Sequence, residues 1–287
     1  MTDGSAQVQG AEGELVGAYG LRVRGVDSAR ALLVPAERSW PSVELLSRIG
    51  ESSSDPYDRV SNQRAELKLL EGSRVVIERE KGRAVFIGAN PPRPEELVHP
   101  YLAPVAAIYA YWLERESFHA GAFVAGDGVW ALIGERESGK SSTLAWLALH
   151  GYEIVCDDML VLEDGDALAG PRSIDLRPEA AHALGTGEPL GRVGARERWR
   201  LTPGVVRDEL PLRGWIFLRW GDRVECARVP GAERLRRLGA NRGARLPVAD
   251  PPYLIELAAL PGWELHRPQG WHSLALAAER LLETVSD

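Results

Sequence analysis

The chain has 287 residues, of which 45% are hydrophobic and 26% are charged, with a formal net charge of −7 and a pI near 5.5. This composition is typical of a globular protein with one large domain or two smaller ones. The acidic balance argues against general binding to nucleic acid or to an anionic membrane. The two cysteines form no disulfide framework and no metal-ligand spacing, and no apolar run is long enough to span a bilayer, so we expect a cytoplasmic protein.

The N-terminal third of the chain is predicted to be rich in strands. Residues 1–12 are small and polar and are expected to form a flexible N-terminus. Residues 13–98 form the predicted strand-rich domain, because short apolar or alternating runs follow one another with turn residues between them: GLRVRG, ALLVPA, VELLSRI, RAELKLLEG, SRVVIERE and RAVFIG. The pairs Glu71–Gly72 and Lys81–Gly82 are expected at hairpin turns. Prolines 91, 92 and 94 are expected to exclude a regular strand or helix and to mark the domain boundary.

Residues 99–287 are predicted to form a larger α/β domain. Helices are expected at YLAPVAAIYAYWLERE, in the apolar-faced segment that ends at Gly151, at GAERLRRLGA and at WHSLALAAERLLETV. Strands are expected on both sides of the turn Gly126–Gly128 and at YEIVC, MLVLED, SIDLRP, GWIFLRWG and VECARV. The expected fold class is therefore α/β, a mixed sheet with flanking helices plus the smaller strand-rich N-terminal domain.

A glycine-bearing loop follows the second of the two strands that flank this turn. Residues 134–141 read GERESGKS, which is the spacing G-x-x-x-x-G-K-[ST]. In such loops backbone N–H groups enclose phosphate oxygens, the lysine reaches the terminal phosphates and the last hydroxyl ligates Mg²⁺. The helix that follows adds the positive end of its dipole. We therefore expect ATP and Mg²⁺ as cofactors, with a turn that caps a helix and binds nothing as the alternative. The expected binding residues are Gly134, Glu135, Arg136, Glu137, Ser138, Gly139, Lys140, Ser141 and Ser142.

Two adjacent carboxylates, Asp157 and Asp158, follow the next predicted strand. A parallel neighbouring strand would bring them to the same edge of the sheet as the phosphates. One carboxylate can hold Mg²⁺ while the other accepts a proton from an attacking hydroxyl. We assign the base to Asp157 and Mg²⁺ to Asp158 together with Ser141, and the reverse division of roles stays open. An ordinary acidic turn is the alternative interpretation.

The segment FHAGAFVAGDGVWALIGERESGKSSTLAWLALHGYEIVCDD resembles the catalytic core of the bacterial HPr kinase/phosphorylase family. Those enzymes share a strand histidine, a turn, a second strand, the phosphate loop, a helix that ends in a basic residue and glycine, and an Asp-Asp strand end. The resemblance implies a P-loop domain related to phosphoenolpyruvate carboxykinase. It also implies that His119 lies near the active site and that Asp157 is the acid/base for a substrate serine.

The loop departs from the family pattern at its centre. The family loop usually reads G-x-S-G-x-G-K-S, whereas Glu137–Ser138 stand at the middle here and Ser142 follows Ser141. The chain looks closer to the divergent HPr-kinase-like proteins of peptide-modifying gene clusters, including lasso peptide kinases. The resemblance therefore implies a peptide or small protein, such as a ribosomal natural-product precursor, as the substrate in place of HPr.

Further candidate residues are aromatic or basic. Arg198 and Arg200 lie in GRVGARERWRLTP, which is expected to be flexible, and either could clamp the charge that develops on a γ-phosphate. The alternative is a solvated basic loop. Arg172 and Arg177 are a second candidate pair near the nucleotide. The nine tryptophans could stack on bases or sugars, but they are dispersed along the chain and most fall in apolar periods, so packing in the core and between subdomains is the expected role.

These patterns together predict a kinase that uses ATP and Mg²⁺ to phosphorylate a hydroxyl, with a serine of a peptide or small protein as the expected acceptor. Lys140 holds phosphates in this scheme, Asp157 takes the proton and His119 orients the acid. The alternatives are a kinase of a small-molecule hydroxyl, a nucleotide-gated peptide-binding protein without transfer activity, and a structural protein with a vestigial loop. No nucleic-acid or membrane partner is expected, and assembly into a homo-oligomer stays open.

Overall fold

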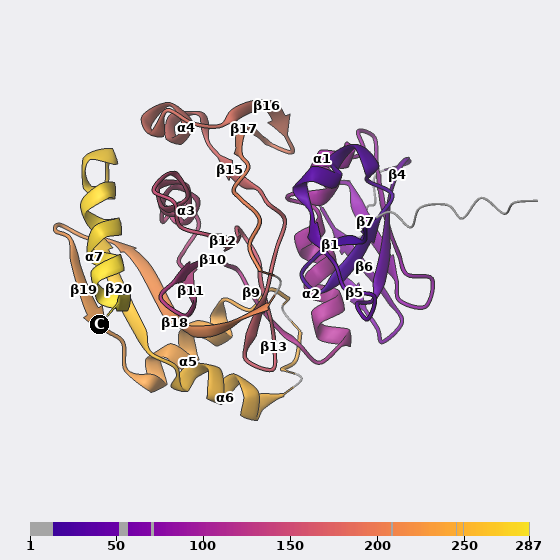
Figure 1. Ribbon diagram of the computed structural model, residues 1–287. Coiled ribbons are helices and arrows are strands. Elements are labelled where there is room, and N and C mark those ends of the chain that lie inside the picture. The colour runs from indigo at the N-terminus through magenta and orange to yellow at the C-terminus, as the bar shows by residue number, and fades with distance from the viewer. Residues whose placement is uncertain are drawn as a thin grey trace, which may run out of the picture.

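The computed structural model of the protein describes residues 14–51, 57–69, 72–207, 209–244, 246–248 and 250–286. Within these residues the fold is mixed α/β, with three sheets (Figure 1). The expected N-terminal segment 1–12 and Glu71 of one expected hairpin turn lie outside the described residues.

The first sheet has eight strands in the order β3-β1-β2-β4-β8-β7-β6-β5. Strand β4 lies parallel to β2 and β8, and the other neighbouring pairs are antiparallel. The expected turn at Lys81–Gly82 joins β7 to β8, and Gly82 has a φ of 54°, a left-handed conformation that glycine adopts without strain. The strands are β1 Val16–Ala18, β2 Leu21–Arg24, β3 Val34–Pro35, β4 Ser42–Ile49, β5 Arg59–Val60, β6 Arg64–Lys68, β7 Arg74–Glu78 and β8 Arg83–Gly88.

Two expectations for the N-terminal part of the chain were wrong. Of the run ALLVPA (residues 31–36), the first two residues end a 3₁₀ helix, η1 (Asp27–Leu32), and only Val34–Pro35 pairs as a strand. The prolines after residue 90 do not exclude a helix, because α1 (Pro94–Val98) begins at one of them. The first helical position needs no N–H donor, so proline is tolerated there. The Glu96 carboxylate also accepts the Arg93 N–H at 3.1 Å, which caps this short helix.

The second sheet has nine strands and holds the glycine-bearing loop. Its path is β12-β10-β11-β18-β14-β13-β9, and β20 pairs with both β18 and β19. Strand β11 lies parallel to β18, and β18 lies parallel to β20. Strand β10 is antiparallel to both β11 and β12. The strands are β9 Glu116–Phe118, β10 Ala120–Ala125, β11 Gly128–Ile133, β12 Ile154–Cys156, β13 Leu160–Glu163, β14 Asp166–Leu168, β18 Glu209–Trp220, β19 Glu225–Arg228 and β20 Gly262–Arg267.

Both faces of this sheet are buried, because its central strands are apolar at successive positions. In β18, Trp215 and Phe217 belong to one hydrophobic cluster, while Ile216 and Leu218 belong to another on the opposite face. Helices α3 (Lys140–Leu149) and α7 (Leu274–Ser286) contribute to the second cluster, and α5 (Gly231–Ala240) and α6 (Pro251–Ala259) to the first. Figure 1 shows α5 and α6 away from α3 and α7.

A third, three-stranded sheet has the order β15-β17-β16 and contains the stretch that was expected to be flexible. Its strands are β15 Ile174–Leu176, β16 Glu188–Val193 and β17 Arg196–Leu201. Helix α4 (Pro178–Leu184) follows β15. Helix α2 (Leu102–Trp112) packs against β9 and β13 of the second sheet, and its Trp112 carbonyl accepts from Arg79, the residue after β7, at 2.9 Å, so α2 connects the first two sheets. Among the described residues, none of the helices combines the length and the apolar character that crossing a bilayer requires.

Candidate functional site

The strand directions bring one end of several strands to a single edge of the second sheet. Strands β11, β18 and β20 run parallel, and β12 runs in the same direction because antiparallel β10 lies between it and β11. Their carboxyl ends therefore meet at one edge, together with the start of β10. In open α/β sheets, ligands bind at the carboxyl ends of strands. From the sequence, a parallel neighbouring strand was considered for the acid pair; β12 does run in the same direction as β11, but β10 lies between them.

A cavity of about 710 Å³ lies at this edge. This volume is within the usual range for a pocket that holds a small organic ligand. Of the binding and catalytic residues predicted from the sequence, ten line it: His119, Arg136, Glu137, Gly139, Lys140, Ser141, Ser142, Asp157, Asp158 and Arg198. Four do not: Gly134, Glu135, Ser138 and Arg200. The cavity thus brings the phosphate-loop residues together with both carboxylates and the histidine.

The loop is a tight turn into helix α3. Gly139 has a φ of 92° and precedes the first helical residue, Lys140. Gly134 has no room for a side chain, because an added Cβ would lie 2.4 Å from Ser138 Oγ. Lys140 Nζ donates to the Gly134 carbonyl at 2.7 Å and to the Glu135 carbonyl at 3.5 Å. Gly134 and Glu135 therefore act through their backbone, by holding the lysine at the loop.

Lys140 is an almost buried cation close to the acid pair. Its exposed fraction is 8%, and burial lowers its pKa, although the charges of Asp157 and Asp158 oppose that change. An ammonium group held in this way has lost much of its hydration. A phosphate group in the cavity would supply a negative charge that compensates the Lys140 ammonium group for this lost hydration.

The two aspartates have different surroundings. Asp157 is 4% exposed, and its Oδ1 accepts a hydrogen bond from Ser141 Oγ at 3.1 Å. Burial, and then the neighbouring charge of Asp158, raise its pKa to about 7. Asp158 is half-exposed in the cavity and has a left-handed φ of 75°. Each carboxylate therefore has its own partner: Ser141 for Asp157 and His119 for Asp158.

His119 comes from the chain just before β10, and its ring faces Asp158. The distance between His119 Nδ1 and Asp158 Oδ1 is 3.4 Å. Partial burial lowers the pKa of His119, and Asp158 opposes this effect. The backbone N–H of His119 donates to the carbonyl of Asn241 at 2.7 Å, and Asn241 is the residue directly after α5.

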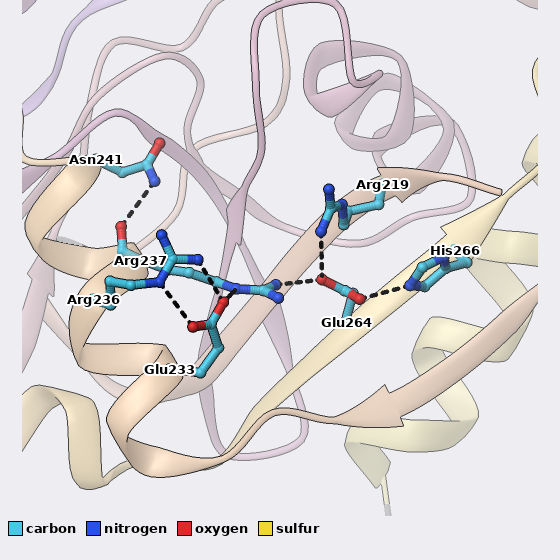
Figure 2. A network of polar contacts seen from close by, with 7 residues as sticks. All are labelled: Arg219, Glu233, Arg236, Arg237, Asn241, Glu264 and His266. Carbon is cyan, nitrogen blue, oxygen red and sulfur yellow. Dashed lines mark hydrogen bonds and ion pairs between the residues drawn. The ribbon is translucent and has the colours of Figure 1, made fainter.

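A polar network holds that end of α5 on the sheet. Figure 2 shows Arg237 of α5 between Glu233 and Glu264, and Asn241 Nδ2 donating to the Arg237 carbonyl at 2.8 Å. Glu264 of β20 also contacts His266 at 2.6 Å. The network therefore fixes β20 and, through Asn241, the backbone of His119.

The two arginines assigned to the γ-phosphate have different environments. Arg198 is partly exposed and lines the cavity, with its Nη1 3.3 Å from Asp175 Oδ2. Arg200 is buried and donates to Asp175 at 2.9 Å and to the His99 carbonyl at 2.8 Å. The expectation that Arg200 reaches the nucleotide was wrong, because Arg200 is buried and does not line the cavity, although its partners Asp175 and His99 do.

The second pair of candidate arginines, Arg172 and Arg177, also has two different environments. Arg177 lines the cavity and donates to Glu137 at 2.5 Å. Arg172 donates to the carbonyls of Pro203 and Ala31 at 3.1 Å each and does not line the cavity. Arg172 therefore joins the N-terminal part of the chain to the rest.

The cavity also contains residues that the sequence did not predict, among them His99, Trp220, Arg267 and Trp271. His99 is 2% exposed, and burial lowers its pKa. Trp220 and Arg267 are the last residues of β18 and β20, so the rule that ligands bind at strand ends could have selected them. That rule needs the strand order, which the sequence does not reveal.

The oxygen atoms at the acid pair fit Mg²⁺. The Ser141 hydroxyl and the Asp157 carboxylate already touch, and hydroxyl and carboxylate oxygens are ligands of this cation. Among the described residues, no group of three or more His, Cys, Asp or Glu side chains could hold a metal ion. Mg²⁺ commonly binds with one or two carboxylates, water and substrate phosphates, so this donor set suits an ion that arrives with a nucleotide.

Comparison with known proteins leaves the family undetermined. No family model matches the chain, and no curated protein matches it. Among solved structures, the chain is similar to the Hpr(Ser) kinase/phosphatase from Coxiella burnetii at 13% identity, and the match covers 60% of this chain and 97% of that one. At a TM-score of 0.30 this likeness carries no argument about the site, so the function is inferred from the geometry of the cavity.

Proposed function

We propose that the protein is a kinase that uses ATP and Mg²⁺ to transfer the γ-phosphate to a hydroxyl group, and that the acceptor is a serine of a peptide or small protein. One observation carries this proposal. A single cavity contains the lysine and the hydroxyl of a phosphate loop, two carboxylates with separate partners, and a histidine beside one of them. Phosphoryl transfer needs this combination of positioning, charge neutralisation and a base.

The loop would bind the phosphates. Its backbone N–H groups and the N-terminus of α3 favour negative charge, and Lys140 adds a cation that is already held at the loop. Ser141 and Asp157 would hold Mg²⁺, which when bound neutralises charge on the β- and γ-phosphates. This assignment differs from the one made from the sequence, which gave Mg²⁺ to Asp158. The contact between Ser141 and Asp157 supports the change.

The proton would leave through Asp158. A half-exposed carboxylate in the cavity is accessible to an acceptor that arrives from solvent, and His119 keeps it in place. The acceptor O–H gives its proton to this carboxylate while its oxygen forms a bond to the γ-phosphorus. The bond from the γ-phosphorus to the bridging oxygen breaks, and ADP leaves with that electron pair. Arg198 lines the same cavity and would contact the transferred group.

The peptide acceptor rests on the resemblance of residues 118–158 to HPr-kinase-like proteins of peptide-modifying gene clusters. The third sheet offers a compatible surface. Within the described residues, β16 pairs with β17 along one edge only, and the same hairpin carries Arg198 into the cavity. A peptide can add to such a strand edge through backbone hydrogen bonds, although the Leu190 carbonyl of β16 already accepts from Arg93 Nη2 at 3.4 Å.

The test is the intact mass of a serine-containing peptide encoded beside this gene, after incubation with the protein, Mg²⁺ and ATP. We expect one added phosphate with the wild type and none with Asp158→Asn. If the peptide gains no phosphate while ATP still binds, small hydroxyl compounds are tested in the same way. If no acceptor is phosphorylated, the nucleotide-gated binding protein becomes the better interpretation. If ATP does not bind, the kinase proposal is wrong.

A further inference from the structure

One corner of the cavity contains two tryptophans and an arginine that the transfer reaction does not use. Trp220 ends β18 and Arg267 ends β20, and these two residues are register partners in the parallel pair. Trp271 begins the 3₁₀ helix η3 (Trp271–Ser273) that follows β20. All three line the cavity that contains Lys140. We call Trp220, Arg267 and Trp271 the tryptophan corner.

The two tryptophans of this corner are exposed, whereas the other tryptophans are not. All nine lie in the described part of the chain, and only Trp220 (37%) and Trp271 (43%) are exposed. Single exposed apolar residues are common and need no explanation. Here the only two exposed tryptophans line one cavity, and Arg267 covers one face of the Trp220 ring, so the parts of both rings that stay exposed are available to a flat ligand. The expectation that tryptophans serve in packing was therefore wrong for these two.

Arg267 links the corner to the phosphate loop. Its guanidinium carbon lies 4.3 Å from the centre of the Trp220 ring, and the residue is 5% exposed. Its Nη1 donates to the Gly270 carbonyl at 3.3 Å and to Ser273 Oγ at 3.5 Å, and no ion pair to a carboxylate is found for it among the described residues. A Cβ added to Gly139 would lie 2.5 Å from Arg267 Nη2. A buried cation without a carboxylate partner, placed against the loop, is suited to an anionic ligand.

The other face of β20 is held by a separate set of contacts. Side chains along a strand point to its two faces in turn, so Glu264 and His266 share one face of β20 and Arg267 lies on the other. Glu264 and His266 belong to the network with α5 in Figure 2. Arg219, the neighbour of Trp220, approaches Glu264 to 3.7 Å on that same face. The network therefore fixes both strand ends without using the side chains of the tryptophan corner.

The order of strands determines the order in which the functional groups lie along the cavity. At the ligand-binding edge, the acid pair ends β12, the phosphate loop follows β11, and the tryptophan corner ends β18 and β20. With strands about 4.8 Å apart, the acid pair and Arg267 each lie about two strand spacings, roughly 10 Å, from β11 on opposite sides. A nucleotide with its phosphates on the loop and its terminal phosphate toward the acids would extend its base toward the corner.

We propose that the tryptophan corner binds the purine base of the nucleoside triphosphate whose phosphates lie on the loop. This inference rests on the proposed function and adds the residues that recognise the base. The base stacks on the exposed indole rings, for which it has a flat π face of matching size. Gln269, exposed and in the cavity lining, has both a donor and an acceptor for the base edge. Arg267 contacts the phosphate side of the ligand.

The experiment compares ATP with inorganic tripolyphosphate, which has the phosphates and no base, by calorimetric titration with Mg²⁺. Trp271→Ala is expected to weaken ATP binding by about 5- to 100-fold, the range for loss of one stacked base. Binding of tripolyphosphate should change by less than about twofold, since the loop is intact. Trp271→Phe keeps an aromatic face and should restore most of the ATP affinity. Leu276→Ala is the matched control, because Leu276 is 57% exposed and does not line the cavity.

The outcomes separate this inference from the proposed function. If Trp271→Ala binds ATP as tightly as the wild type while Lys140→Ala binds it more weakly, the base-site proposal is wrong and the kinase proposal stands. Equal loss of ATP and tripolyphosphate binding would also overturn it, because that pattern means a distorted loop. If the wild type binds neither compound, both the base site and the proposed function are wrong.

Discussion

The hydroxyl of Ser141, in the first turn of α3, donates a hydrogen bond to the carboxylate of Asp157 at the end of β12, 3.1 Å away. This contact joins the glycine-bearing loop to the acid pair. It leaves Asp158 to its own partner, His119, at 3.4 Å. The two carboxylates are adjacent in the chain and yet face different groups, so their substitution should have different effects.

The first prediction concerns the roles of the two aspartates. Asp158→Asn should lower kcat by about 100-fold or more, as expected for the loss of a general base, with the Kd for Mg·ATP within about threefold of the wild type. Asp157→Asn should instead weaken Mg²⁺-dependent ATP binding by about 10-fold. Titration and initial rates at several Mg²⁺ concentrations measure both effects. The opposite result, with binding intact and turnover lost in Asp157→Asn, would restore the assignment made from the sequence.

The second prediction concerns pH and stability of the metal-free protein. Burial raises the pKa of Asp157 from 3.8 to about 7. The folded state therefore keeps a proton that the unfolded chain releases above about pH 4. The free energy of unfolding should fall as pH rises from about 4 to 7, by at most about 4 kcal/mol for this group at about 1.4 kcal/mol per pH unit.

Asp157→Asn should remove this loss of stability. In urea denaturation with a chelator present, the variant should match the wild type near pH 4 and exceed it by about 1–4 kcal/mol near pH 8. A variant that is no more stable than the wild type at pH 8 would show that the Asp157 carboxylate is not destabilised by burial.

The third prediction concerns the loop lysine. Lys140→Ala should weaken binding of both ATP and tripolyphosphate by about 10- to 100-fold, because a buried cation at the loop is lost. Lys81→Ala is the control, since that lysine pairs with Glu78 on the first sheet and does not line the cavity. Equal affinities in Lys140→Ala and the wild type would mean that the loop does not bind phosphate.

The fourth prediction separates the two arginines of β17. Arg200→Met should lower the free energy of unfolding by about 3–5 kcal/mol, because the buried Asp175 carboxylate loses its 2.9 Å partner. Arg198→Met should change it by less than about 1 kcal/mol, since Arg198 is only partly buried, but should lower the transfer rate. Urea denaturation and phosphorylation rates of both variants test this. Similar stability losses in the two variants would contradict the separation.

The fifth prediction concerns Glu137, which has a φ of 71° at the position where the family pattern has glycine. A side chain costs about 1–2 kcal/mol in this left-handed conformation. Glu137→Gly should therefore be about 1 kcal/mol more stable than Glu137→Ala, even though both lose the exposed ion pair with Arg177. Thermal unfolding of the two variants isolates the backbone effect. Greater stability of the alanine variant would mean that this conformation is not strained.

Much of the candidate site could be predicted from local patterns. The loop, the helix after it and the acid pair at a strand end depend on residues that are close in the chain. Their backbone N–H groups and side chains are arranged by one strand-loop-helix unit, so spacing alone is informative. The strand-rich N-terminal segment and most helices followed in the same way from apolar periodicity.

What the sequence by itself determined was therefore a local arrangement: a glycine-bearing loop with a lysine and a hydroxyl, two carboxylates and a histidine within residues 119–158. Only the tertiary structure decided that β10 separates β11 from β12, that Arg200 is buried while Arg198 lines the cavity, and that Trp220 and Arg267 end neighbouring strands. Strand order and burial depend on packing between segments far apart in the chain, and residue type and spacing carry no direct record of that packing.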